Sequence, residues 1–166
     1  MEKRNGLIFV MMLALAALGM PSCNPSRLTV REINTSSLEK KILIAAWKTD
    51  FKDAVVEKLV QGLRSGPYYI RVVDVRDLDA ESMQTYTAAV LLDSCWAWSL
   101  SAATKRFLAA AQDKSRIVLA VTAVIRGWKP KDTGVDIIST ASDAEKAEEV
   151  ARTVLAKLRK TLAGGY

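Results

Sequence analysis

The sequence predicts an α/β fold in which helices cover both faces of a mostly parallel sheet. From residue 41 onward, short runs of consecutive apolar residues recur, as is typical of strands that are buried on both faces. Amphipathic segments with helical spacing separate several of these runs, as in βαβ units. The chain of 166 residues is long enough for one such domain.

Five apolar runs are predicted to be strands. They are residues 42–47, 68–75, 88–92, 117–121 and 135–138. The connection 125–134 between the last two runs is shorter than a usual parallel crossover, which needs about a dozen residues or more. Two alternatives therefore stay open for the last strand: a compact crossover to a parallel strand, or an antiparallel edge strand.

Helices are predicted between these strands from apolar residues at helical spacing. They cover residues 51–63 with Asp50 as N-cap, a short segment 79–86, residues 101–112, and residues 143–162. The last is the clearest, because Val150, Val154 and Leu158 share one stripe, which should face the sheet. Acidic residues early in this segment and basic residues late in it also suit the helix dipole.

The N-terminal residues are typical of an export signal. Lys3 and Arg4 precede an apolar run from Leu7 to Met20, which is shorter than the roughly 20 residues of a transmembrane helix. Ser22-Cys23 follows and resembles the lipobox of bacterial lipoproteins, which implies that Cys23 is acylated, with palmitate among its chains. A cleaved secreted protein with an incidental cysteine, or an uncleaved anchor, is the alternative.

These features divide the chain into a lipoprotein signal peptide (1–22), a tether (23–40) and a folded domain (41–166). The mixed polar composition of the second segment, without sustained periodicity, is the reason for calling it a tether. We expect export, a lipid anchor in the cell membrane or the outer membrane, and a domain outside the cytoplasm.

Composition excludes several classes of chemistry. The chain has no histidine, which excludes Ser-His-Asp and Cys-His catalysis and histidine-ligated zinc, and two cysteines cannot form a four-cysteine metal site. The 24 basic and 18 acidic residues are spread out, so we expect no nucleic-acid partner. Cys95 is interpreted as inert, and Asp74, Asp77 and Asp79 as a solvated loop rather than a calcium site.

Four segments resemble flavodoxins. Residues 42–60 resemble the first strand, phosphate loop and first helix, and 86–94 resemble the segment "Y-D-x-I-x-x-G-S-P". Residues 103–108 resemble the helix "V-K-x-F-L", and 117–122 resemble the fourth strand. The resemblance, over roughly residues 41–160, implies a three-layer flavodoxin-like fold with a five-stranded, mostly parallel sheet. It also implies a site for FMN at the carboxyl ends of the strands.

The phosphate loop departs from the family's T-x-T-G-x-T, because residues 47–52 read W-K-T-D-F-K. Asp50 replaces the glycine and is expected to cap the helix, while Lys48 and Lys52 are expected to point to solvent. Asp93 likewise replaces the glycine before Ser94. A chain that is exported unfolded also cannot carry noncovalent FMN, so the sequence favours no cofactor. If FMN is bound, its ligands would be Lys48, Thr49, Lys52, Ser94, Trp96 and Trp98.

All four tryptophans lie at the predicted ligand edge: Trp47 ends the first strand, Trp96 and Trp98 follow the third, and Trp128 follows the fourth. They are interpreted in three ways, as a plug that fills the vacated FMN cavity, as the lining of a pocket for a planar or sugar-like ligand, or as an exposed patch for a partner protein.

The sequence thus favours a non-enzymatic, membrane-tethered, flavodoxin-like binding or interaction module of the cell envelope. Its expected partners are the lipid bilayer, through acylated Cys23, and an unidentified envelope protein or small ligand. The alternative is an FMN-binding electron-transfer protein or flavin-dependent oxidoreductase. A structural lipoprotein that acts through its tether and termini is a third hypothesis.

Overall fold

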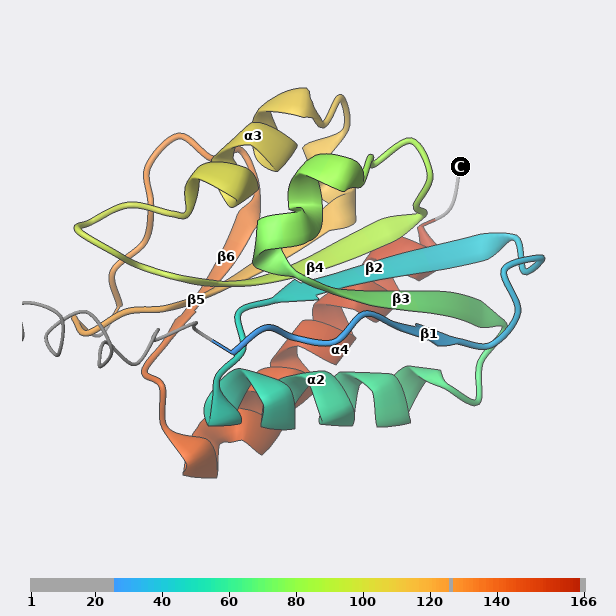
Figure 1. Ribbon diagram of the computed structural model, residues 1–166, viewed down its shortest axis with the longest axis horizontal. Coiled ribbons are helices and arrows are strands. Elements are labelled where there is room, and N and C mark those ends of the chain that lie inside the picture. The colour runs from blue at the N-terminus through green and yellow to red at the C-terminus, as the bar shows by residue number, and fades with distance from the viewer. Residues whose placement is uncertain (1–25, 126, 165–166) are drawn as a thin grey trace, which may run out of the picture.

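The computed structural model describes residues 26–125 and 127–164, which form one six-stranded sheet with helices on both faces (Figure 1). The strand order is β1-β3-β2-β4-β5-β6. The strands are β1 (Arg31–Ile33), β2 (Lys40–Ala46), β3 (Tyr68–Asp74), β4 (Ala88–Ser94), β5 (Ile117–Thr122) and β6 (Asp136–Thr140). Strands β2 to β6 run parallel, so their carboxyl ends lie along one edge, which we call the carboxyl edge.

Helices pack on the two faces because successive strand residues point in opposite directions. Ile42 and Ile44 face α2 (Asp50–Leu63) and α4 (Ala147–Ala163), whereas Leu43 and Ala45 face the 3-10 helix η1 (Val75–Ala80) and α3 (Ala102–Ala110). Figure 1 shows these two layers on opposite sides of the sheet. Two further 3-10 turns are η2 (Lys114–Arg116) and η3 (Ala144–Lys146).

The predicted stripe of the last helix is buried against the sheet, with Val150, Val154 and Leu158 in the core. None of the helices among the described residues is long and apolar enough to span a bilayer.

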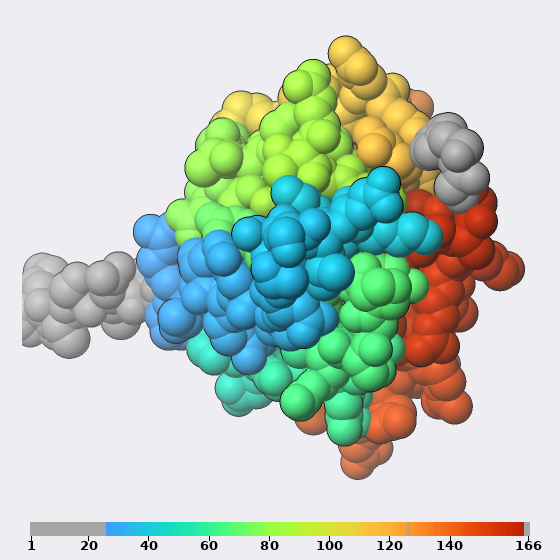
Figure 2. Space-filling model, turned by 90° about the vertical axis from the view of Figure 1, so that its right-hand side faces the viewer, coloured from blue at the N-terminus to red at the C-terminus, as the bar shows by residue number. Residues whose placement is uncertain are grey.

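The sixth strand lies within the segment predicted as a tether. β1 pairs antiparallel with β3, with Arg31 opposite Val72 and Ile33 opposite Ile70, and the nearby side chain of Leu28 is buried. In Figure 2 these N-terminal residues (blue) lie directly on the body of the domain. Residues 27–40 are therefore part of the domain and not a tether. The edge strand β1 has only three residues, Arg31, Glu32 and Ile33, and thus forms no apolar run that the sequence could reveal.

One local prediction differs from the structure, and one open question is resolved by it. The short helix expected at 79–86 is instead the 3-10 helix η1 at 75–80, which begins where the side chain of Asp74 accepts a hydrogen bond from the Arg76 N–H. The last strand, whose direction the sequence left open, is parallel to β5. It is reached by an irregular connection without a helix, in which Gly127, Asp132 and Gly134 have positive φ angles.

Candidate functional site

Every described residue that is predicted from the sequence to belong to a site lies at the carboxyl edge. In open parallel sheets this edge is where ligands bind. Lys48 and Thr49 follow β2, Ser94 ends β4, Trp96 and Trp98 follow it, and Trp128 lies in the connection after β5. The proposed lipidation residue, Cys23, lies outside the described residues.

Asp93 organises the centre of this edge. Its side chain is fully buried, and Oδ1 accepts hydrogen bonds from Trp47 Nε1 at 2.6 Å and from the Ser94 N–H at 2.8 Å. Oδ2 accepts from the Ser101 N–H at 3.0 Å. The carboxylate therefore holds together both ends of the loop 94–101, and Ser101 in turn caps α3.

Lys52 lies beside this carboxylate. The prediction that it points to solvent is wrong: only 2% of the residue is exposed, and Nζ donates to Ser94 Oγ at 2.5 Å. Ser94 Oγ is also within 3.3 Å of Thr122 Oγ1. Burial lowers the pKa of Lys52 to about 8, and the negative charge of Asp93 opposes that shift. The polar groups of this cluster satisfy one another inside the fold.

The start of α2 also differs from the prediction. Thr49, not Asp50, is the N-cap, and its Oγ1 accepts from the Lys52 N–H at 3.2 Å. Asp50 is the first residue of the helix and is exposed. Lys48 does turn outward, where it pairs with Asp53. Thr49 caps the helix because its extended backbone places the hydroxyl over the first turn.

Trp96 and Trp98 are exposed, at 76% and 65% respectively, so they do not plug a cavity. They belong to a tight turn in which the Trp96 and Ser99 backbones exchange hydrogen bonds of 3.0 and 2.9 Å. Its two central residues, Ala97 and Trp98, have positive φ angles of 46° and 63°. Such angles are costly for residues other than glycine, so the surrounding structure must hold this turn in place.

An apolar hollow of about 240 Å³ opens between this turn and the connection after β5. Its lining residues are Cys95, Ala97, Trp98, Ala123, Val124, Ile125 and Trp128. Trp128 is half-buried there and Cys95 is partly exposed at the border. The structure thus brings Trp98 and Trp128 together, whereas Trp47 lies apart over Asp93.

Sequence reasoning missed Arg76 as a member of this edge. Its guanidinium lies 5.3 Å from the centre of the Trp47 ring and donates to both carboxylate oxygens of Asp74, at 2.7 and 2.8 Å. The interpretation of Asp74 as part of a solvated loop is wrong, because the residue is fully buried. One feature of the sequence could have indicated that Asp74 and Asp93 belong to the site. Each is an acidic residue at the end of an apolar run that is predicted to be a buried strand.

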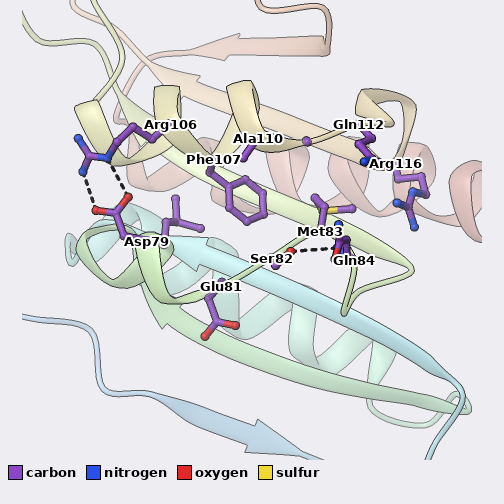
Figure 3. A pocket seen from close by; sticks show the side chains of 12 residues that line it. Asp79, Glu81, Ser82, Met83, Gln84, Arg106, Phe107, Ala110, Gln112 and Arg116 are labelled. Atoms are coloured by element: carbon purple, nitrogen blue, oxygen red, sulfur yellow. Dashed lines mark hydrogen bonds and ion pairs between the residues drawn. The ribbon is translucent and has the colours of Figure 1, made fainter.

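A second hollow, of about 160 Å³, lies between η1 and α3 (Figure 3). At one end Asp79 and Arg106 form a two-pronged ion pair, with hydrogen bonds of 2.9 and 2.6 Å, and Phe107 and Met83 form its apolar wall. Asp77 forms an ion pair with Arg27 through one carboxylate oxygen. Within the part of the chain that the structure describes, no group of acidic and cysteine side chains is arranged to hold a metal ion.

No protein-family model and no curated protein matches this sequence. Solved structures do match in shape. A flavodoxin from the domain Archaea has a TM-score of 0.51 and 15% identity, over 74% of this chain and 99% of that one. Oxidised flavodoxin 2 from Bacillus cereus has a TM-score of 0.51 and 14% identity, over 72% and 99%. The Flv1 flavodiiron core from Synechocystis has a TM-score of 0.55 and 8% identity, over 78% of this chain and 38% of that one.

Identities this low establish the fold and nothing about chemistry. The parallel sheet, its two helical layers and these structural neighbours together show that the chain has the α/β flavodoxin-like fold.

Proposed function

We propose that this chain is an exported, lipid-anchored, flavodoxin-like binding module of the cell envelope that works without FMN. The observation that carries the proposal is the inward side chain of Lys52. It lies in the loop that resembles the flavodoxin phosphate loop, yet its ammonium is already bonded to Ser94 and lies near buried Asp93. A bound phosphate would need hydrogen-bond donors that have no other partner. In this loop the Lys52 ammonium already has a partner within the chain.

Charge at this edge also disfavours a phosphate. A phosphate group brings about −1.5 to −2 charges at neutral pH. The positive charge of Lys52 already interacts electrostatically with one buried carboxylate, that of Asp93, and the exposed carboxylate of Asp50 lies in the first turn of α2. The Thr49 hydroxyl, which the family resemblance assigns to the phosphate, accepts a hydrogen bond as the helix cap.

The anchor in this proposal is Cys23. It is supported by the basic residues, the apolar run from Leu7 to Met20 and the Ser22-Cys23 pair. The prediction concerns residues before Ser26, where the described chain begins.

An FMN-dependent electron carrier or reductase is the second candidate. The apolar hollow beside Trp98 and Trp128 favours it, because it lies between the loops that follow β4 and β5, and because aromatic side chains can stack on a planar ring. Flavodoxins are also among the structural neighbours.

Titration with FMN separates the two candidates. The purified full-length protein in detergent should bind FMN with a Kd weaker than about 100 µM, or roughly −5.5 kcal/mol, as measured by quenching of flavin fluorescence. The double variant Asp93→Gly/Lys52→Thr, which restores two residues of the family pattern, should bind FMN more tightly than the unmodified protein. Micromolar binding by the unmodified protein would overturn the proposal and favour the electron carrier.

Fractionation tests the anchor independently. Cys23→Ser should release the protein from the membrane fraction or leave the signal peptide uncut, and the unmodified protein should show the mass of an acylated cysteine. A Cys23→Ser protein that is correctly cut and still membrane-bound would contradict the lipid anchor.

A further inference from the structure

The described chain begins at the carboxyl edge. Because β1 is antiparallel to β3, the residues before β1 run back toward the carboxyl end of β3. The Ser26 carbonyl accepts a hydrogen bond of 3.0 Å from Arg76, and the Leu28 N–H donates to Asp74 at 2.9 Å. In Figure 1 the blue start of the chain lies at the same end of the sheet as the loops after β4 and β5.

This placement fixes where a lipid on Cys23 could be, an inference that rests on the proposed lipid anchor. Two residues, Asn24 and Pro25, lie between Cys23 and Ser26, so three Cα-to-Cα steps join them, and a fully extended chain spans roughly 10 Å over three steps. The polar layer on each side of a bilayer's hydrocarbon core is itself only about 5–8 Å deep. An acyl chain on Cys23 would therefore hold the carboxyl edge against the membrane surface.

The carboxyl edge also presents the largest apolar side chains that are exposed. Among the described residues, five large hydrophobic residues are exposed, and four of them lie in the two loops after β4 and β5. The four are Trp96, Trp98, Val124 and Ile125. Tryptophan favours the boundary between lipid and water, because its ring is apolar and its N–H is a hydrogen-bond donor.

A continuous chain of contacts joins the start of the domain to these loops. Arg76 binds Ser26 and lies over Trp47, Trp47 donates to Asp93, and Asp93 holds both ends of the loop that carries Trp96 and Trp98. About three to four strand spacings, or roughly 15–20 Å, separate the two places along the edge. The start of the described chain, at Ser26, is thus connected through side-chain contacts to the loop that carries the two tryptophans.

Positive charge lies next to the tryptophans. A hollow of about 290 Å³ beside Trp98 is bordered by Lys105, Lys114 and Lys131, and Asp132 is the one acidic residue in its lining. Lys105 and Lys131 are exposed. Such lysines attract the anionic headgroups of a membrane surface.

From these observations we infer that the carboxyl edge docks on the lipid surface of the membrane to which Cys23 is anchored. Trp96, Trp98, Val124 and Ile125 enter the interfacial layer, and Lys105 and Lys131 contact anionic headgroups. The partner of this surface is the bilayer itself, and the domain is held in one orientation instead of moving freely on a tether.

The test uses the full-length acylated protein in vesicles of phosphatidylethanolamine and phosphatidylglycerol that contain a lipid with a doxyl quencher near its headgroup. About half of the tryptophan fluorescence should be quenched, because two of the four tryptophans lie at the surface. The Trp96→Ser/Trp98→Ser variant should lose most of this quenching while remaining vesicle-bound. In that background, Ser65→Trp reports from the loop after α2, at the opposite edge of the sheet, and should stay unquenched.

Lys105→Glu/Lys131→Glu gives a second readout, because it should reduce quenching in vesicles with phosphatidylglycerol while leaving both surface tryptophans in place. Acylated, vesicle-bound protein without quenching would overturn the docking and leave the lipid anchor intact. Protein that carries no acyl group would overturn both. A detergent-solubilised dimer that Trp98→Ser dissociates, together with absent quenching, would assign the surface to a second copy of the chain and overturn the docking.

Discussion

The backbone N–H of Leu28 donates a hydrogen bond of 2.9 Å to the carboxylate of Asp74, which lies 46 residues later at the end of β3. Asp74 is fully buried and also accepts from Arg76. Burial alone would raise the pKa of Asp74, but the hydrogen bonds from Arg76 and Leu28 outweigh it and hold the pKa below its usual value. A buried charge therefore fixes the entry of the chain into the domain.

Asp74→Asn should release the segment before β1 and lower the free energy of unfolding by about 3 kcal/mol, because it removes the charge that Arg76 and the Leu28 N–H bind. Urea denaturation measures the loss, and hydrogen exchange should show faster exchange of the Leu28 N–H.

Asp77→Asn is the matched control, because its ion pair with Arg27 is exposed and should contribute less than about 1 kcal/mol. Since the pKa of Asp74 is lowered in the folded state, its stabilisation is complete above the ordinary pKa of about 4 and is lost as the pH falls through the folded value. The difference in free energy of unfolding between the unmodified protein and Asp74→Asn should therefore decrease in that acidic range. Equal losses in the Asp74 and Asp77 variants would contradict this assignment.

Leu158→Ala should lower the free energy of unfolding by about 2–5 kcal/mol, because the Leu158 side chain is fully buried between α4 and the sheet. Lys160→Ala, on the exposed side of the same helix, should change it by less than about 0.5 kcal/mol. Chemical denaturation of both variants is the measurement. A Leu158→Ala loss as small as that of the control would mean that the helix register is wrong.

Most of the sheet could be predicted from the sequence, because strands buried on both faces must be nearly continuous apolar runs. The edge strand β1 could not, since only one of its sides pairs and its side chains are polar or partly exposed. The connection to β6 could not either, because positive φ angles at residues such as Asp132, and not a helix, turn the chain there.

For Lys52 in the site, the residue type and the helical periodicity predict opposite environments. Lys52 precedes Val55, Val56 and Leu59 at helical spacing, which places it on the buried side of α2, whereas its charge favoured solvent. Burial prevails because Ser94 Oγ, distant in the sequence, accepts a hydrogen bond from the ammonium, and the negative charge of Asp93 acts on it as well. The exposure of Trp98 likewise depends on a positive φ angle that no apolar pattern reveals.

Ala97→Gly should raise the free energy of unfolding by about 0.5–1 kcal/mol. Ala97 has a φ angle of 46°, which costs an L-residue about 1–2 kcal/mol, and the greater freedom of glycine in the unfolded chain offsets part of the gain. Ala109→Gly, at an exposed position in the last turn of α3, should have the opposite effect and cost about 0.5–1 kcal/mol. Urea denaturation that shows both variants destabilised alike would contradict the strain at Ala97.

The free energy of unfolding should also depend on Lys52 in a defined alkaline range. The pKa of Lys52 falls from 10.5 to about 8 on folding because of burial, with Asp93 opposing the shift. Between these two values the unfolded chain binds the proton that the folded chain has released, so the contribution of Lys52 to stability rises with pH. Below about pH 8 the ammonium is charged in both states, and the full desolvation penalty remains.

Lys52→Met removes this titration, so the stability of the unmodified protein relative to this variant should increase by about 2 kcal/mol between about pH 7 and pH 9.5. The increase with pH is the test, because the absolute difference also contains the effect of leaving Asp93 without its neighbouring cation. In Lys52→Arg the side chain stays charged throughout this range. The free energy of unfolding of the unmodified protein, relative to that of Lys52→Arg, should therefore increase by a similar amount over the same pH range. Urea denaturation at the two pH values measures both comparisons. A difference that stays constant with pH would show that the Lys52 ammonium is not desolvated in the folded protein.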